Sequence, residues 1–262
     1  MAERLPLLTD QGPFMDPLGG ARAILEGRLF WTHYEPFIEL GSGKVTGYEA
    51  LARFVRPDGV PVSPGTFFAL LHADPQLLFD VELAVKRHQL AHAPRHGELF
   101  LNLDPDSWAA GGEGPDNPLL DLLASAGRPV VVEVIENLDV SDALVSRGMV
   151  AAARARGLRI ALDDVGAANS LLSFEALDEA EVLKFDRTLL RALGRPRRRA
   201  VIQALTRMAR ETGARTILEG VETAKDLQLA KELGVDWVQG WFFEELAIQS
   251  PRPAQARPRI GA

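Results

Sequence analysis

Two adjacent carboxylates end an apolar segment near the middle of the chain. The segment reads ALDDVG, in which small and apolar residues lead directly into Asp163 and Asp164. Because two neighbouring negative charges repel each other, either water solvates both at the end of a strand or a cation lies between them. This pair by itself leaves both interpretations open.

Polar side chains recur at or near the ends of other apolar segments. The set comprises Glu49, Asn102, Glu133, Glu136, Asp163, Asp164, Lys184, Asp186, Glu219, Glu222 and Gln239. Glu133 is the most informative, since it lies inside the apolar run VVVEVIEN, where an unpaired carboxylate is costly to bury. Single members have ordinary explanations: Lys184 and Asp186 suit a structural ion pair, and Glu222 suits the first turn of a helix. Recurrence on successive segments favours a common site.

Oxygen ligands without cysteine or clustered histidine favour hard cations such as Mg²⁺ or Mn²⁺. The carboxylates are too many for one ion that keeps its waters, so we predict two ions that share an aspartate. Paired ions of this kind lie about 3.5–4 Å apart and serve in-line displacement at phosphorus. Lys184 would then hold the attacking water or stabilise the charge of the transition state.

The elements that must position these residues alternate in type. β-Rich segments are predicted at residues 29–40, 44–54, 98–105, 129–137, 158–166, 181–186, 215–222 and 235–243, mostly with helical spacing between them. This alternation predicts an α/β fold, a modified TIM (β/α)8 barrel. Residues 41–44 (GSGK) are too short for a crossover helix, so the first two segments form a hairpin and one strand is antiparallel. An open doubly wound sheet is the alternative.

Composition sets broad limits on partners and location. The 262 residues are 47% hydrophobic and carry a net charge of −7, which argues against a DNA or RNA polymer as partner. Cysteine is absent, and we find neither a membrane span nor a signal peptide, so we expect a cytoplasmic protein. We expect an irregular leader over residues 1–19, a barrel domain over 20–248 and a disordered tail over 249–262.

Seven motifs in order resemble those of the EAL-domain phosphodiesterases. They are YEALARF, LNLDP, VEVIEN, ALDDVG, LKFDR, LEGVET and QGWFF, and the resemblance runs from about residue 20 to 246. It implies a barrel with one reversed strand and a homodimer. It also implies hydrolysis of cyclic di-GMP to linear pGpG with two Mg²⁺ or Mn²⁺ ions.

The resemblance assigns a role to each matching residue. Glu49, Asn102, Glu133 and Asp163 would bind the first ion, while Asp163 and Asp164 share the second, with Glu219 as a further ligand or as general base. Lys184 would position the water, and Glu222 and Gln239 would support the site. The predicted ligand contacts are Glu35, Leu51, Arg53 and Asp186, and Glu136 would anchor the loop after the fifth strand.

Two departures from the family pattern favour another interpretation. Glu35 stands where the family usually has glutamine, and Ala167, Ala168 and Asn169 replace Thr, Gly and Tyr in the loop that is thought to couple metal binding to dimerisation. The alternative is a catalytically impaired EAL-fold receptor that binds cyclic di-GMP or a protein partner. A barrel enzyme acting on another phosphate ester is the third, because fold and metal site do not fix the substrate.

Overall fold

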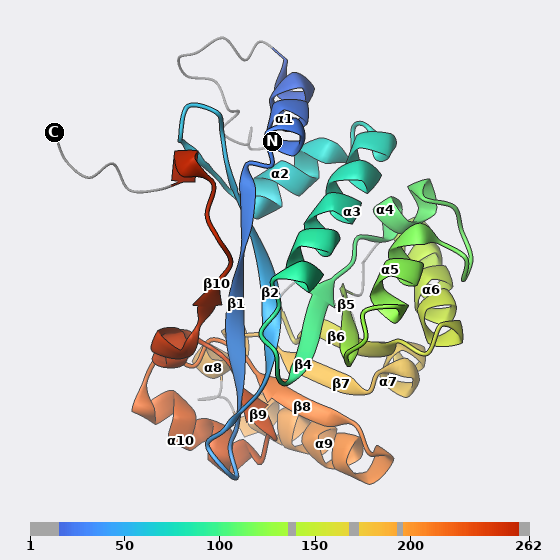
Figure 1. Ribbon diagram of the computed structural model, residues 1–262. Coiled ribbons are helices and arrows are strands. Elements are labelled where there is room, and N and C mark those ends of the chain that lie inside the picture. The colour runs from blue at the N-terminus through green and yellow to red at the C-terminus, as the bar shows by residue number, and fades with distance from the viewer. Residues whose placement is uncertain (1–15, 136–139, 168–172, 193–195, 257–262) are drawn as a thin grey trace, which may run out of the picture.

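Eight strands close into a barrel in the computed structural model, which describes residues 16–135, 140–167, 173–192 and 196–256 (Figure 1). They are β1 (Phe30–Glu39), β2 (Val45–Val55), β4 (Glu98–Asn102), β5 (Val130–Ile135), β6 (Arg159–Val165), β7 (Val182–Phe185), β8 (Arg215–Leu218) and β9 (Trp237–Val238). From β2 to β9 each strand lies parallel to the next. Because β1 pairs with both β2 and β9, the sheet is closed. The predicted barrel is confirmed over the open sheet.

The reversed strand is β1, which is antiparallel to both of its barrel neighbours. The GSGK turn joins it to β2, and Gly43 in that turn has the left-handed φ of 69°. The hairpin predicted from this short link is therefore confirmed. Its register places Glu35 directly opposite Glu49. Since β1 runs against the other strands, Glu35 reaches the mouth of the barrel from the middle of its strand rather than from the carboxyl end.

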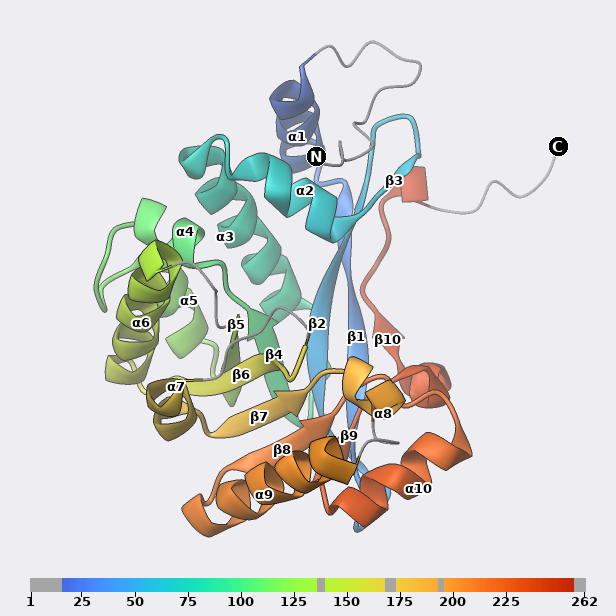
Figure 2. The ribbon, with the colours of Figure 1, turned by 180° about the vertical axis from the view of Figure 1, so that it is seen from behind.

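Helices cover the outside of the barrel. They are α1 (Pro17–Glu26), α2 (Pro64–Leu71), α3 (Pro75–Ala91), α4 (Pro105–Ala110), α5 (Pro118–Ala124), α6 (Val140–Ala155), α7 (Phe174–Glu179), α8 (Thr188–Ala192), α9 (Pro196–Thr212), α10 (Ala224–Leu233) and the 3-10 helices η1 (Trp241–Leu246) and η2 (Ala254–Ala256). Figures 1 and 2 place α3 to α6 on one side and α9 and α10 on the other. Thr223 and Asp226 form a capping box at the start of α10, and Gly234 ends the helix. No described helix is long and apolar enough to cross a membrane.

Both ends of the barrel domain carry structure that we did not expect. α1 begins at Pro17, inside the segment expected to be irregular, and Asp16 caps it by accepting a bond from the Leu18 N–H at 3.0 Å. Residues 1–15 lie outside the described residues.

A short strand, β3 (Pro61–Val62), pairs antiparallel with β2 and so extends the β1–β2 hairpin.

The expectation of a disordered tail from residue 249 is wrong as far as residue 256. β10 (Ile248–Gln249) pairs antiparallel with β1. The next residue, Ser250, donates its N–H to the Thr32 carbonyl at 2.9 Å and accepts the Thr32 N–H on its hydroxyl at 2.8 Å. The proline-rich composition predicted disorder, but the free edge of β1 offers backbone partners that composition does not reveal.

The interior of the barrel is closed by a layer of apolar side chains. Its members are Phe37, Phe100, Val131, Ala161, Val182, Ile217 and Trp237. Side chains two residues apart on a strand point to the same face. The residues two positions beyond this layer on the parallel strands therefore also point inward, one layer nearer the mouth. They are Asn102, Glu133, Asp163, Lys184, Glu219 and Gln239.

Candidate metal centre

Lys184 lies among the carboxylates at the barrel mouth. Its Nζ is 2.5 Å from Glu133 Oε1, 2.9 Å from Glu219 Oε1, 3.0 Å from Asp163 Oδ1 and 3.6 Å from Glu49 Oε2. The lysine is fully buried, so these carboxylates replace the water that its ammonium would otherwise bind. The structure thus brings four of the predicted metal ligands together around the predicted catalytic lysine.

Two amides hold the carboxylates in place. Asn102 donates its Nδ2 hydrogens to Glu133 Oε2 at 2.9 Å and to Glu49 Oε1 at 3.2 Å. Gln239, which is buried, donates from Nε2 to Glu49 Oε2 at 2.6 Å. Both oxygens of Glu49 are therefore oriented by hydrogen bonds. Because its nitrogen is turned to the carboxylates, the amide oxygen of Asn102 is left as the atom that could bind a metal ion.

Asp163 and Asp164 reach the same site because β6 is irregular at this point. In a regular strand, adjacent side chains point to opposite faces. Here the register against β7 shifts between Leu162 and Val165, and Asp164 has the left-handed φ of 55°, which is uncommon outside glycine. Irregularities of this kind redirect a side chain. The Asp164 N–H also donates to Asp163 Oδ1 at 3.0 Å, which fixes one aspartate relative to the other.

The carboxylates form two groups that share Asp163. Ligand oxygens of Glu49, Glu133 and Asp163 lie within 4.8 Å of one another, and so do those of Asp163, Asp164 and Glu219. All of these donors are hard oxygen atoms, the type that Mg²⁺ and Mn²⁺ prefer. The donor set therefore fits a divalent cation in each group, with the shared aspartate between them. The number of ions stays a prediction.

Negative charge exceeds positive charge in this cluster. Burial and the neighbouring Glu49 raise the pKa of Glu133 well above its usual value. Burial also raises the pKa of Glu219 to about 8, although Lys184 lowers it. Burial disfavours the charge of Lys184, but the surrounding carboxylates raise its pKa well above normal and keep it protonated. The carboxylates are thus only partly neutralised, a condition that divalent cations relieve.

Three of the four predicted ligand contacts line the same mouth. Glu35 is half-buried opposite Glu49; burial and the charge of Glu49 raise its pKa to about 7, while Gln239 lowers it by hydrogen bonding. Leu51 and Arg53 follow Glu49 at intervals of two residues on β2, and both line a cavity beside the cluster. These side chains line the site on the side of the β1–β2 hairpin.

The remaining predicted residues either make other contacts than those predicted or lie outside the residues that the structure describes. Asp186 is buried, but its Oδ1 accepts the Thr188 N–H at 2.8 Å and the Thr188 hydroxyl at the start of α8. Glu222 is exposed and forms no ion pair within the described part of the chain; its N–H donates to Asp226 Oδ2 at 3.3 Å. Their assigned roles stay predictions. Glu136, Ala168 and Asn169 lie outside the described residues.

A family model described as "EAL domain" matches residues 21–245. The chain belongs to the EAL domain family. The matched range contains the whole carboxylate cluster and Lys184, which agrees with the resemblance drawn from the seven motifs.

Curated relatives of this EAL domain are longer proteins. The chain is 30% identical over 230 residues to "Uncharacterized protein sll1895" of Synechocystis, covering 84% of this chain and 33% of that protein. It is 27% identical over 228 residues to "Probable cyclic di-GMP phosphodiesterase PdeB" of Escherichia coli, covering 84% and 43%. The chain therefore spans less than half the length of these relatives.

Solved EAL structures share the barrel. One is "PaMucR Phosphodiesterase, c-di-GMP complex", with a TM-score of 0.70 and 25% identity, covering 91% of this chain and 98% of that chain. Another is "Klebsiella pneumoniae BlrP1 pH 6 manganese/cy-diGMP complex", with a TM-score of 0.66 and 26% identity, covering 81% and 55%. These likenesses confirm the modified TIM barrel.

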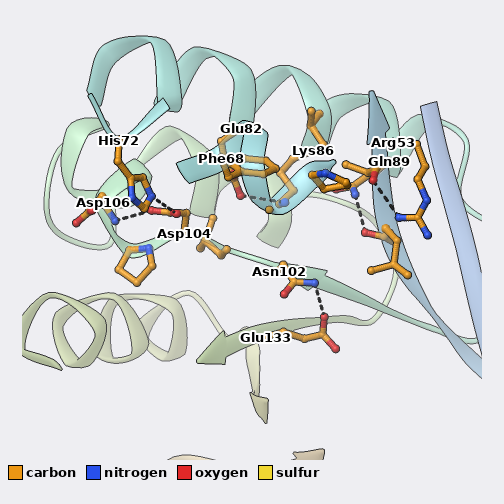
Figure 3. A pocket seen from close by; sticks show the side chains of 18 residues that line it. Arg53, Phe68, His72, Glu82, Lys86, Gln89, Asn102, Asp104, Asp106 and Glu133 are labelled. Atoms are coloured by element: carbon orange, nitrogen blue, oxygen red, sulfur yellow. Dashed lines mark hydrogen bonds and ion pairs between the residues drawn. The ribbon is translucent and has the colours of Figure 1, made fainter. Parts of the chain in front are cut away.

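A cavity of about 520 Å³ adjoins the carboxylate cluster of this EAL domain (Figure 3). Asn102 and Glu133 line it from the cluster side, and α2, α3 and the start of α4 supply other walls. The buried pair Glu82 and Lys86 in the cavity wall was not predicted from the sequence. Their spacing of four residues on α3 was the available signal, but such pairs are common on exposed helix faces. The group His72, Asp104 and Asp106 in the cavity wall was not predicted either.

Proposed function

We propose that this EAL domain is a divalent-metal-dependent phosphodiesterase that hydrolyses cyclic di-GMP to linear pGpG. The observation that carries the proposal is the pair of carboxylate groups that share Asp163 around Lys184. The names of the relative PdeB and of the MucR and BlrP1 complexes support cyclic di-GMP as the ligand. The ions would be held by Glu49, Asn102, Glu133, Asp163, Asp164 and Glu219.

Divalent ions bound there would neutralise phosphate charge and make a water molecule more nucleophilic. The protein supplies the positioning. The ammonium of Lys184 lies 2.5–3.0 Å from oxygens of Glu133, Asp163 and Glu219, so it would orient the attacking water once bound ions take over those carboxylate oxygens. Glu219 keeps 19% of its side chain exposed, whereas Glu133 keeps 0%, so Glu219 is the carboxylate better placed to accept the proton of that water.

The proposed step is a single displacement at phosphorus. A bond forms between the water oxygen and phosphorus as the bond from phosphorus to the ribose 3′ oxygen breaks. The water proton passes to Glu219, and the leaving 3′ oxygen takes a proton from solvent. Arg53, half-buried in the cavity wall two residues beyond Leu51, is placed to bind a phosphate oxygen of the ligand.

A receptor that binds cyclic di-GMP without turnover is the second candidate, and Glu35 favours it. Its carboxyl lies opposite Glu49, so above pH 7 it adds a further negative charge beside the site. That charge opposes the additional negative charge that develops at phosphorus during hydrolysis more than it opposes a bound phosphodiester, which carries a single charge. Both candidates bind the same ligand, and turnover separates them.

The test is incubation of the purified protein with cyclic di-GMP and either Mg²⁺, Mn²⁺ or EDTA, followed by chromatography of the nucleotides. We expect linear pGpG in the metal samples alone. Asp163→Asn should lower the rate at least about 100-fold, because it removes the ligand that the two groups share. Glu211→Gln, on the exposed face of α9, is the matched control and should leave the rate unchanged.

Each other outcome has a definite meaning. Full activity of Asp163→Asn, or product formation in EDTA, would contradict the proposed mechanism. Binding without product in any metal would establish the receptor. A homodimer and a cytoplasmic location stay predictions, and sedimentation velocity with and without cyclic di-GMP tests the first.

A further inference from the structure

A histidine and two aspartates from separate segments meet in the wall of the cavity (Figure 3). His72 follows the last residue of α2, Asp104 precedes the first residue of α4, and Asp106 lies in the first turn of α4. One potential ligand atom of each residue lies within 4.8 Å of the others. The fold thus brings one nitrogen donor and two oxygen donors together, although His72 and Asp104 are 32 residues apart in the sequence.

The distances between these donors suit a small tetrahedral ion. His72 Nε2 lies 2.8 Å from Asp104 Oδ2, and His72 Nδ1 lies 4.0 Å from Asp106 Oδ2. Ligand atoms at about 2.0–2.1 Å from a tetrahedral Zn²⁺ lie about 3.3 Å from one another, which is between these two values. The side chains of His72 and Asp106 are 45% and 55% exposed, so a small rotation of each can bring its ligand atom to the ion without disturbing the core.

Asp104 presents one carboxylate oxygen from a fixed position. Its Oδ1 caps α4 by accepting the Asp106 N–H at 2.9 Å and the Ser107 N–H at 3.2 Å. Its other oxygen, Oδ2, is the one that lies beside His72. Carboxylates that bind metal ions are commonly oriented by hydrogen bonds of this kind. The cap therefore holds Asp104 with one oxygen directed toward the other two donors.

The presence of a nitrogen donor distinguishes this group from the proposed catalytic centre. The other two groups of potential metal ligands among the described residues consist of carboxylates alone. Sets of oxygen donors suit Mg²⁺ and Mn²⁺, whereas an imidazole nitrogen favours Zn²⁺ over Mg²⁺. The cavity thus adjoins two kinds of ligand set with different metal preferences.

We propose that His72, Asp104 and Asp106 form a Zn²⁺ site that is separate from the proposed catalytic centre. Three protein ligands leave the fourth position of a tetrahedral ion to water, as in other open zinc sites. The inference goes beyond the proposed function and does not depend on turnover of cyclic di-GMP.

A bound ion connects the end of α2 to the start of α4, which are two walls of the cavity. Such a link opposes local opening of α2, so amide hydrogen exchange in this helix should slow when Zn²⁺ is added to wild type. The same addition should leave the exchange of α2 in His72→Ala unchanged. Equal exchange rates in wild type with and without bound Zn²⁺ would contradict the link between the two walls.

The main experiment measures Zn²⁺ affinity by competition with a fluorescent chelator, in an excess of Mg²⁺ that occupies the carboxylate groups. We expect wild type to bind one Zn²⁺ under these conditions. His72→Ala and Asp106→Asn should each weaken binding at least about 100-fold, because even the loss of a group that only supports a ligand costs about 10–100-fold. Both changes are at exposed side chains, and circular dichroism verifies that the variants are folded.

Two controls identify the residues that hold the ion. His92→Ala, at an exposed histidine that follows α3, should keep the wild-type affinity. The chain has five histidines. In an NMR spectrum of the imidazole rings, Zn²⁺ should therefore shift the signals of a single histidine, and these signals should be missing from the spectrum of His72→Ala.

Asp163→Asn separates this inference from the proposed function. It removes the aspartate that the two carboxylate groups share and none of the three ligands of the zinc site, so Zn²⁺ affinity should be unchanged. Loss of Zn²⁺ binding in Asp163→Asn, or wild-type affinity in both His72→Ala and Asp106→Asn, would overturn the inference. So would the absence of Zn²⁺ binding to wild type in excess Mg²⁺. Failure of wild type to form pGpG would contradict the proposed function alone.

Discussion

Replacing Lys184 by methionine removes the buried cation among the carboxylates while keeping most of the side-chain volume. Removing one partner of a buried ion pair costs about 3–5 kcal/mol, because the other charge is left uncompensated. Lys184 lies within 3.6 Å of four carboxylates. We therefore expect Lys184→Met to lower the free energy of unfolding of the metal-free protein at pH 8 by an amount near the upper end of this range.

The size of the loss should depend on pH. The folded-state pKa of Glu219 is raised from its ordinary 4.5 to about 8, and that of Glu133 is raised as well. The folded protein therefore binds more protons than the unfolded chain between these values, and the free energy of unfolding falls as pH rises through this window. Burial raises the pKa of Glu49, but Lys184 and hydrogen bonds bring it below its ordinary value; without Lys184 it rises too, and this additional group makes the decline steeper. The difference in free energy of unfolding between wild type and Lys184→Met should then be small at pH 5 and larger at pH 8.

Urea unfolding at pH 5 and pH 8 in EDTA measures this effect, with Lys225→Met on the exposed surface of α10 as the matched control. Adding Mn²⁺ should raise the stability of both the wild type and Lys184→Met, because a ligand that binds the folded state stabilises it. Turnover of Lys184→Met should stay low even so. An unfolding midpoint equal to that of wild type at pH 8 in EDTA, or a loss independent of pH, would refute the reasoning.

Two further changes test the surroundings of Glu49. Since the pKa of Glu35 is raised to about 7, its negative charge develops as pH rises through 7, and the affinity of wild type for cyclic di-GMP in EDTA should fall between pH 6 and 8. Calorimetry should show a flatter profile for Glu35→Gln; equal declines would show that Glu35 does not face the ligand. Gln239→Ala removes the 2.6 Å bond to Glu49 and should lower kcat about 10–100-fold, as measured by release of pGpG. An unchanged kcat would mean that Glu49 is oriented without Gln239.

The strands and the reversed hairpin were predictable because they depend on short-range signals. The GSGK link is too short for anything but a turn, and the apolar runs end in the polar residues that the parallel strands then gather. Asp164 shows the limit of such reasoning. Strand alternation would turn it away from Asp163, and the irregularity that brings it back depends on the register of β6 against β7. That register is a property of two segments, which the motif alone does not contain.

The Glu82 and Lys86 pair was missed for a related reason. A glutamate four residues before a lysine suits an exposed helix face, and the sequence gives no sign that these side chains are buried. Their burial comes from the packing of α3 against its neighbours, with α4 on one side and the β1–β2 hairpin on the other (Figure 1). The strand β10 was not predicted for the same reason, namely that its structure depends on a distant segment. Its partner is the edge of β1, more than two hundred residues earlier in the chain.

The apolar layer inside the barrel explains why the charge balance at the mouth is so sensitive. Phe37, Phe100 and Trp237 pack against one another at ring distances of 4.5–6.3 Å and close the barrel beneath the carboxylates. Water therefore does not reach Lys184 and Glu133 from below, and their charges must be compensated within the polar layer or from the open mouth. The lysine compensates part of the negative charge from within. A divalent cation that completes the balance would enter from the open mouth, and so would the phosphate of the proposed ligand, so the fold would bring both to the same face.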